Sequence, residues 1–429
     1  MTGIRECILY RDFEQGELLE KMTMLMEDIS HPKVLYGKDG EYFACIHQLV
    51  EMAGTYGFAG NLWHDYLTYL LVNHENAFST ACEIVGPVEG TINAFAMHDF
   101  EIFKQLYDFD LKELEKIYPS VDSSLITDYQ NINEGSKVFN KRIRDRICTL
   151  AQKLAKAEST EEFMDDMVQF YKEFGVGKLG LHKAFRIDGT VTPARIVPIT
   201  NIAHVHLDDL VGYEIAKKKL IDNTEAFVQG RPANNCLLFG DAGTGKSSSI
   251  KGILNQYYDQ GLRIIEAYKH QFKDLNDIIA QVKNRNYKFI IYMDDLSFEE
   301  FEIEYKYLKA VIEGGLEKKP DNILIYATSN RRHLIRETWS DRSDKDEELH
   351  RSDTVQEKLS LAARFGVSIN YSKPTQQEYF QIVTNLAKKY PEITMSDKEL
   401  CAEANKWELS HGGISGRTAQ QFINYIAAK

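Results

Sequence analysis

Residues 240–247 read Gly-Asp-Ala-Gly-Thr-Gly-Lys-Ser and fit the pattern G-x-x-x-x-G-K-[ST]. An apolar run, Cys236 to Phe239, comes directly before them, and a helical pattern begins at Lys246. Glycines let successive backbone N–H groups curl around an anion, and the start of the following helix adds a positive dipole end. The sequence therefore predicts a phosphate-binding loop between a strand and a helix.

Two side chains of this loop have distinct predicted tasks. Lys246 is expected to reach the β- and γ-phosphates of a nucleotide, and the Ser247 hydroxyl is expected to bind Mg²⁺. The predicted nucleotide-binding residues are Gly240, Asp241, Ala242, Gly243, Thr244, Gly245, Lys246, Ser247 and Ser248.

Short apolar runs and amphipathic segments alternate on both sides of the loop. The candidate strands are 235–239, 262–267, 288–293, 322–328 and 366–371, with helical patterns at 246–258, 274–284 and 302–313. Such alternation predicts a parallel sheet with crossover helices over residues 201–373. After Pro374 only helical patterns follow, so residues 374–429 are predicted to form a small separate helical unit.

The candidate strand 288–293 ends in two acids, Asp294 and Asp295. An apolar strand that ends in an acid about 50 residues after the loop resembles a Walker B element. Asp294 is predicted to hold Mg²⁺ through its water shell. Asp295 is predicted to orient and polarise an attacking water.

The first 175 residues carry a different pattern. Apolar residues recur at three- and four-residue spacing, which predicts a helical domain over residues 1–175. Residues 176–200 contain Gly and Pro turns between short β-like runs and are predicted to be a connector that could hold a hairpin.

Charge and cysteine content exclude several classes of protein. The net charge is −13, and residues 1–100 alone contain 15 acidic and 5 basic side chains. A chain this acidic does not attract the phosphate backbone in general, which argues against a protein that coats nucleic acid. The six cysteines are scattered without C-x-x-C spacing, which predicts reduced thiols. The sequence shows no apolar leader and no apolar run near 18 residues, so we expect a cytoplasmic protein without a membrane span.

Three further motifs follow the loop along the chain, and their order and spacing relative to the loop are informative. They are YATSNRR at 326–332, EKLSLAARFG at 357–366 and GGISGRT at 412–418. With LDDLVG at 207–212, they resemble the AAA+ ATPases over residues 207–418. The resemblance implies that Asn330 is the sensor 1 residue, Arg364 the arginine finger and Arg417 the sensor 2 arginine of a C-terminal lid. It also implies that residues 207–212 pack beside the adenine.

Longer segments point to one bacterial family. DDLSFEE, YKYLKAVIEGGLEKKPDNILIYATSNRRHL and SGRTAQQF look like the AAA+ family catalogued as domain of unknown function 815. That family pairs a helical N-terminal region with a C-terminal AAA+ module. AAA+ ATPases commonly carry Asp-Glu where this chain has Asp294-Asp295. The family tolerates Asp-Asp there, and Glu299 is a rival for the water-activating role.

The expected fold is therefore an α/β AAA+ P-loop NTPase core with a C-terminal helical lid, preceded by a mainly α-helical domain. The resemblance implies hydrolysis of Mg-ATP to ADP and phosphate, with Arg364 acting on the nucleotide of a neighbouring subunit in a homo-oligomer. The acidic N-terminal domain is expected to choose a protein partner that the motor remodels. Two alternatives stay open: a nucleic-acid-associated switch or loader, and a nucleotide-dependent scaffold with little hydrolysis.

Overall fold

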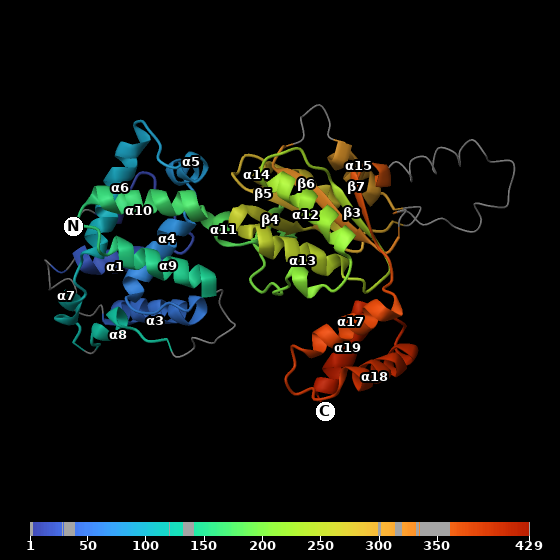
Figure 1. Ribbon diagram of the computed structural model, residues 1–429. Helices are drawn as coiled ribbons and strands as arrows, with labels where there is room; N and C mark the ends of the chain where they lie inside the picture. Colours follow the sequence, from blue (N-terminus) through green and yellow to red (C-terminus); the bar gives the residue numbers. More distant parts are fainter. Residues whose placement is uncertain are drawn as a thin grey trace. The chain divides into compact units, whose positions relative to one another are not determined.

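The computed structural model describes residues 3–27, 29, 39–119, 121–131, 141–298, 302–313, 320–331, 334 and 361–428. The chain divides into two compact units, Met1–His182 and Lys183–Lys429 (Figure 1). Each unit has its own buried core, so each is described by itself.

The N-terminal unit is helical, as predicted. Its helices are α1 (Glu17–Glu27), α3 (Asp39–Tyr56), α4 (Leu62–Asn73), α5 (Ala77–Val85), α6 (Ile92–Tyr107), α7 (Lys112–Glu115), α8 (Ser124–Thr127), α9 (Lys141–Leu154), α10 (Thr160–Phe174) and α11 (Gly177–Leu181). Asn61 caps α4 and Asn76 caps α5, each accepting a hydrogen bond from backbone N–H of the first turn. These caps explain where both helices begin.

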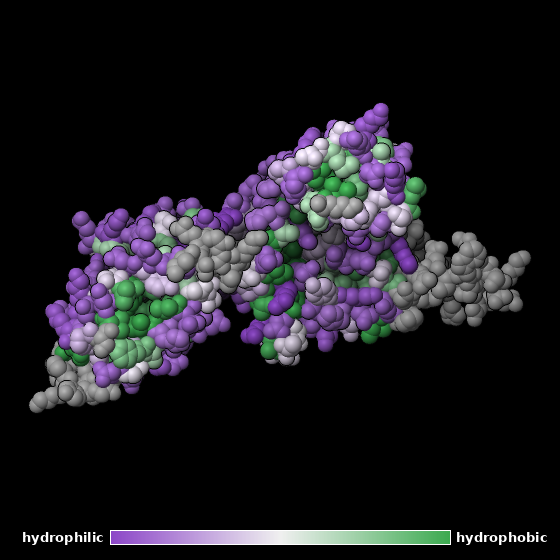
Figure 2. All heavy atoms as spheres, turned by 90° about the horizontal axis from the view of Figure 1, so that it is seen from below, coloured by the Kyte–Doolittle hydropathy of each residue, from purple (hydrophilic) through white to green (hydrophobic). Residues whose placement is uncertain are grey.

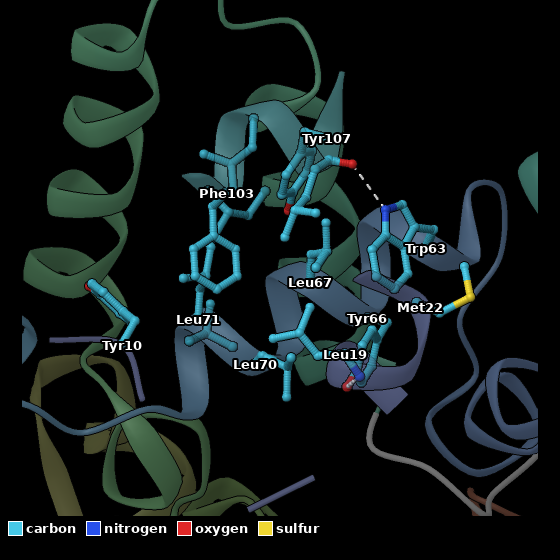
Figure 3. Close-up of a cluster of buried hydrophobic side chains, with 14 of the residues drawn as sticks. Tyr10, Leu19, Met22, Trp63, Tyr66, Leu67, Leu70, Leu71, Phe103 and Tyr107 are labelled. Carbon is cyan, nitrogen blue, oxygen red and sulfur yellow. Dashed lines mark hydrogen bonds between the residues drawn. The ribbon is translucent and has the colours of Figure 1, made fainter. Parts of the chain in front are cut away.

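Helix α4 lies at the centre of this unit's core. Trp63, Leu67 and Leu71 of α4 are fully buried and face Phe103 and Tyr107 of α6 (Figure 3). The Trp63 indole N–H donates to the carbonyl of Leu106 at 3.0 Å. The polar edge of a large buried ring is thereby satisfied, which removes the main cost of burying a tryptophan.

A buried carboxylate ties the N-terminal segment to α6. Asp99 is completely buried and accepts the N–H groups of Ile8, Leu9 and Tyr10 at 2.6–3.0 Å. Three backbone donors on one side chain form a strong local anchor.

In the described parts of the C-terminal unit, seven strands form one sheet. Its strands are β1 (Ala184–Asp188), β2 (Arg195–Pro198), β3 (Cys236–Gly240), β4 (Leu262–Glu266), β5 (Lys288–Met293), β6 (Ile323–Ser329) and β7 (Val367–Tyr371). The order is β2-β1-β4-β5-β6-β3-β7, and every neighbouring pair except β1–β2 is parallel. The predicted parallel sheet is confirmed, with β3 between β6 and β7.

Helices α12 (Glu214–Val228), α13 (Lys246–Tyr257), α14 (Leu275–Val282) and α15 (Glu304–Glu313) connect and cover these strands. Strands β3, β5 and β6 are almost continuously buried, as parallel strands covered on both faces require. Leu220 of α12 and Ile253 of α13 pack in the same core as alternate residues of the central strands.

Residues 176–200 were expected to be a connector that could hold a hairpin. They contain the β1–β2 hairpin, and β1 pairs in parallel with β4, with Ala184 opposite Ile264. Burial of Phe185 and Ile187 explains why the hairpin also extends the sheet.

Three helices end the chain: α17 (Gln376–Ala387), α18 (Asp397–Ser410) and α19 (Gly416–Ala427). They form the predicted helical lid around a small core of their own, with Tyr379, Leu400 and Phe422 buried inside it. Capping boxes at Thr375 and Ser396 start α17 and α18. Across the described ranges, no helix is both long and apolar enough to cross a bilayer.

Candidate functional site

Five of the predicted site residues, Lys246, Ser247, Asp294, Asp295 and Asn330, come together at the carboxyl edge of the sheet. Strand β3 leads into the loop at Gly240, β5 ends before Asp294, and β6 ends before Asn330. Because β5, β6 and β3 are parallel neighbours, their carboxyl ends meet at one place. Crevices at this edge of an open α/β sheet are the usual ligand sites.

Two glycines of the loop have backbone conformations that other residues rarely adopt. Gly240 and Gly243 have φ angles of 136° and 73°, and a Cβ on Gly240 would lie 2.1 Å from the carbonyl oxygen of Tyr371. Within the described residues, the N–H groups of Gly243, Gly245 and Lys246 donate to no protein acceptor. A run of such donors at the start of α13 fits a phosphate chain.

Lys246 is held inside the loop. Its side chain is buried, and Nζ donates to the carbonyls of Gly240 (2.9 Å) and Asp241 (2.6 Å) and to Asn330 Oδ1 (3.1 Å). Burial lowers the pKa of Lys246, while the carboxylates of Asp295, Asp241 and Asp294 oppose that change. The ammonium is therefore surrounded by oxygen acceptors, which a phosphate could replace.

Asp294 collects three hydroxyl donors on a single oxygen. Oδ1 accepts from Ser247 (2.8 Å), Tyr292 (2.7 Å) and Thr328 (2.5 Å). Desolvation pushes the pKa of Asp294 upward, but these hydrogen bonds outweigh it and the pKa is lowered overall. An ionised carboxylate beside a serine hydroxyl is the oxygen chemistry that Mg²⁺ prefers.

Asp295 lies beside Asn330 in an uncommon backbone conformation. Its φ of 49° is in the left-handed region, and its N–H donates to Thr328 Oγ1 at 2.9 Å. Asn330 Nδ2 donates to Asp295 Oδ1 at 2.8 Å, so one amide contacts both Lys246 and Asp295. The rival acid, Glu299, lies outside the described residues.

The two predicted arginines lie in different places. The N–H groups of Gly416 and Arg417 donate to the Gly243 carbonyl at 3.0 and 3.3 Å, and the Arg417 charge lowers the pKa of Lys246. Arg364 instead forms an ion pair with Glu313. It precedes β7, whose start pairs with the start of β3, so it lies at the opposite edge of the sheet from the loop.

A family model matches the unit that carries these residues. Residues 181–429 match the model of the family described as "Protein of unknown function (DUF815)". The chain belongs to this family. The match spans the whole C-terminal unit, and its strand order, loop and lid are those of an α/β P-loop NTPase core of the AAA+ type.

Relatives of this DUF815 protein include the replication factor C large subunit of Staphylothermus marinus, 34% identical over 87 residues. That alignment spans 20% of this chain and 20% of the relative. A structure of the Thermotoga maritima RuvB Holliday junction branch migration motor has 15% identity and a TM-score of 0.32, covering 51% of this chain and 71% of its own. A RuvB point mutant has 16% identity and a TM-score of 0.33, with 51% and 72% covered. At these TM-scores, the two structural likenesses carry no argument about activity.

Sequence reasoning missed two hydroxyls of the DUF815 site. Tyr292 and Thr328 both donate to Asp294, and Thr328 also accepts the N–H of Asp295. A polar residue at the end of a buried strand was the available signal. Its partner could not be read from the sequence, because Thr328 is 34 residues from Asp294 and meets it only through strand pairing.

Proposed function

We propose that the chain binds Mg-ATP at residues 240–248 and hydrolyses it to ADP and phosphate. The observation that carries the proposal is that hydrogen bonds join Lys246, Asn330 and Asp295, while Ser247 of the same loop contacts Asp294. Ser247 and Asp294 would hold Mg²⁺, which would neutralise charge on the phosphates.

The chain's own groups divide the remaining work. Lys246 exchanges carbonyl oxygens for phosphate oxygens and offsets negative charge there. The Asp295 carboxylate orients a water molecule, and Asn330 fixes the direction of that carboxylate through a 2.8 Å hydrogen bond. Arg417 brings a positive charge from the lid toward the same site.

The test compares wild type with Asp295→Asn in two assays, equilibrium binding of Mg-ATP and release of phosphate. We expect the variant to bind Mg-ATP within a few-fold of wild type and to lose hydrolysis by at least 100-fold. The matched control is Glu299→Gln. If that variant loses hydrolysis while Asp295→Asn keeps it, the water-activating role moves to Glu299. Wild-type protein that binds no nucleotide would refute the proposal altogether.

Arg364 supports an oligomeric enzyme. An arginine at the edge of the sheet opposite its own loop suits a role on a neighbouring subunit's nucleotide in a head-to-tail assembly. Arg364→Ala should bind ATP normally and lose roughly 10³-fold or more in turnover. Mixing it with Lys246→Ala should restore part of the activity, because the hybrid interface pairs an intact loop with an intact arginine. Wild-type-like turnover of Arg364→Ala would rule out the trans role.

We further propose that the motor is cytoplasmic and remodels a protein partner recruited by its acidic N-terminal unit. Figure 2 shows apolar side chains gathered on a face of this unit, and Phe43, Val50 and Leu125 are among its exposed apolar residues. The test is capture of partners by Asp295→Asn held in ATP. Partners retained equally by residues 183–429 alone would contradict recruitment through the N-terminal unit.

A second candidate, action on nucleic acid, is favoured by the 34% identity to the replication factor C large subunit. ATPase stimulation by DNA, with binding that weakens steeply as salt rises, would select this candidate over the protein remodeller. Turnover that is unchanged by DNA would reject it.

A further inference from the structure

Asp241, the second residue of the loop, connects the loop to the start of the lid. Its Oδ2 accepts the N–H of Lys373 at 3.0 Å, three residues before α17 begins. Its own N–H donates to the carbonyl of Tyr371 at 3.1 Å, at the end of β7. One residue of the loop therefore holds the chain on both sides of Ser372, where the sheet ends and the path to the lid begins.

The same residue also contacts the side chain that would bind phosphate. The Asp241 carbonyl accepts Lys246 Nζ at 2.6 Å and Thr244 Oγ1 at 2.8 Å. A change in the position of the Lys246 ammonium thus alters a hydrogen bond on Asp241 directly. No intermediate residue is needed between Lys246 and the contact with Lys373.

The segment that Asp241 holds has little freedom of its own. Lys373 precedes Pro374, which restricts its backbone to extended conformations. Thr375 caps α17 through a capping box, so the helix begins at once after the proline. The Tyr213 hydroxyl donates to the Ser372 carbonyl at 3.0 Å and its ring stacks on Tyr371. In such a stiff connection, the direction of the lid follows the position of Lys373.

The lid contacts the loop at a second point. Gly243 accepts the N–H groups of Gly416 and Arg417 at the start of α19. A Cβ on Gly243 would lie 3.0 Å from Ser415 Oγ and 3.1 Å from Arg417 Cβ, so this approach is close. The loop therefore contacts both the segment that leads into α17 and the start of α19.

We propose that Asp241 is a positioning residue that transmits the state of Lys246 to the lid through its hydrogen bond with the Lys373 N–H. The inference rests on the proposed function, because it requires a bound phosphate to replace the Asp241 carbonyl as an acceptor for Lys246. The carboxylate makes the contact to Lys373 charge-assisted, which strengthens it relative to a neutral pair.

Amide hydrogen exchange at Lys373, resolved by fragmentation of peptides that span 371–376, tests the proposal on the full chain. In wild type the exchange rate should change when Mg-ADP or a non-hydrolysable ATP analogue binds. In nucleotide-free Asp241→Ala the Lys373 amide should exchange roughly 10- to 100-fold faster than in wild type, since a hydrogen bond to a charged acceptor is lost. Asp241→Asn keeps an oxygen acceptor and should lie between them.

The control variant is Asp222→Ala, an exposed carboxylate on α12 that pairs with Lys218. It should leave the Lys373 amide unchanged. Nucleotide affinity of Asp241→Ala should stay within about threefold of wild type while its kcat falls at least tenfold, because its side chain contacts the lid segment and not the ligand.

Each alternative result has one meaning. Wild type that binds no nucleotide refutes the proposed function. Wild type that binds nucleotide without any change at Lys373 refutes the coupling alone. Unchanged Lys373 exchange in Asp241→Ala also refutes it, as does a folded Asp241→Ala that cannot bind nucleotide, because its side chain would then serve the loop itself.

Discussion

Tyr292→Phe removes a single oxygen from the candidate metal site. Tyr292 is buried in β5, and its hydroxyl donates to Asp294 Oδ1 at 2.7 Å. The ring stays in place, and Ser247 and Thr328 remain as donors to the same oxygen. The substitution therefore tests one hydrogen bond to an ionised carboxylate without creating a cavity in the core.

The expected cost follows from the charge on the acceptor. Hydrogen bonds to charged groups contribute about 1.5–3 kcal/mol, and the partial exposure of Asp294 selects the lower end, about 1.5 kcal/mol. The pKa of Asp294 should rise by about one unit, and the melting temperature of the C-terminal unit should fall by about 3–6 °C. Because the pKa of Asp294 is lowered in the folded protein, its stabilisation is present above the unfolded pKa of 3.8 and is lost as pH falls through the lower folded pKa.

The assay is urea unfolding at pH 7 and at pH 3.5. Unfolding is followed by hydrogen exchange in peptides of β5 and β6, so that the measured free energy of unfolding is that of the C-terminal unit. The penalty of Tyr292→Phe should shrink at pH 3.5. Tyr326→Phe is the matched control, because the Tyr326 hydroxyl bonds only neutral partners, Asn223 and Thr224, among the contacts described for it. Its penalty of about 1 kcal/mol should not depend on pH. An equal penalty for Tyr292→Phe at both pH values would refute the electrostatic account.

Three other substitutions test separate parts of the molecule. Asp295→Ala should lower stability by about 1 kcal/mol more than Asp295→Asn, because asparagine tolerates a φ of 49° better, and thermal unfolding of both variants checks this. Asp99→Ala should destabilise the N-terminal unit by about 3 kcal/mol, since the N–H groups of Ile8–Tyr10 lose their acceptor; exchange of those amides should rise at least 100-fold. Burial raises the pKa of Asp65 to about 7, so the unit loses stability as pH rises from about 4 to 7, and Asp65→Asn should stabilise it more at pH 8 than at pH 5 in urea unfolding.

Local signals were sufficient for the elements of the sheet and lid. The predicted strand 288–293 coincides with β5, and 235–239 lies within one residue of β3, because a buried parallel strand is a continuous apolar run. The capping residues Thr375 and Ser396 begin α17 and α18 where the helical patterns indicated. The hairpin at 184–198 was harder to place, because its pairing with β4 joins segments about 80 residues apart.

The sequence alone was sufficient to infer the loop, the acids that follow β5 and the order of the later motifs. Each of these depends only on neighbouring residues and on their spacing. Strand pairing settled the rest. It brought Thr328 and Tyr292 to Asp294, linked Asn330 to both Lys246 and Asp295, and joined Asp241 to Lys373 across 132 residues. Hydrogen bonds act over about 3 Å, whereas sequence patterns carry no record of which distant segments come that close.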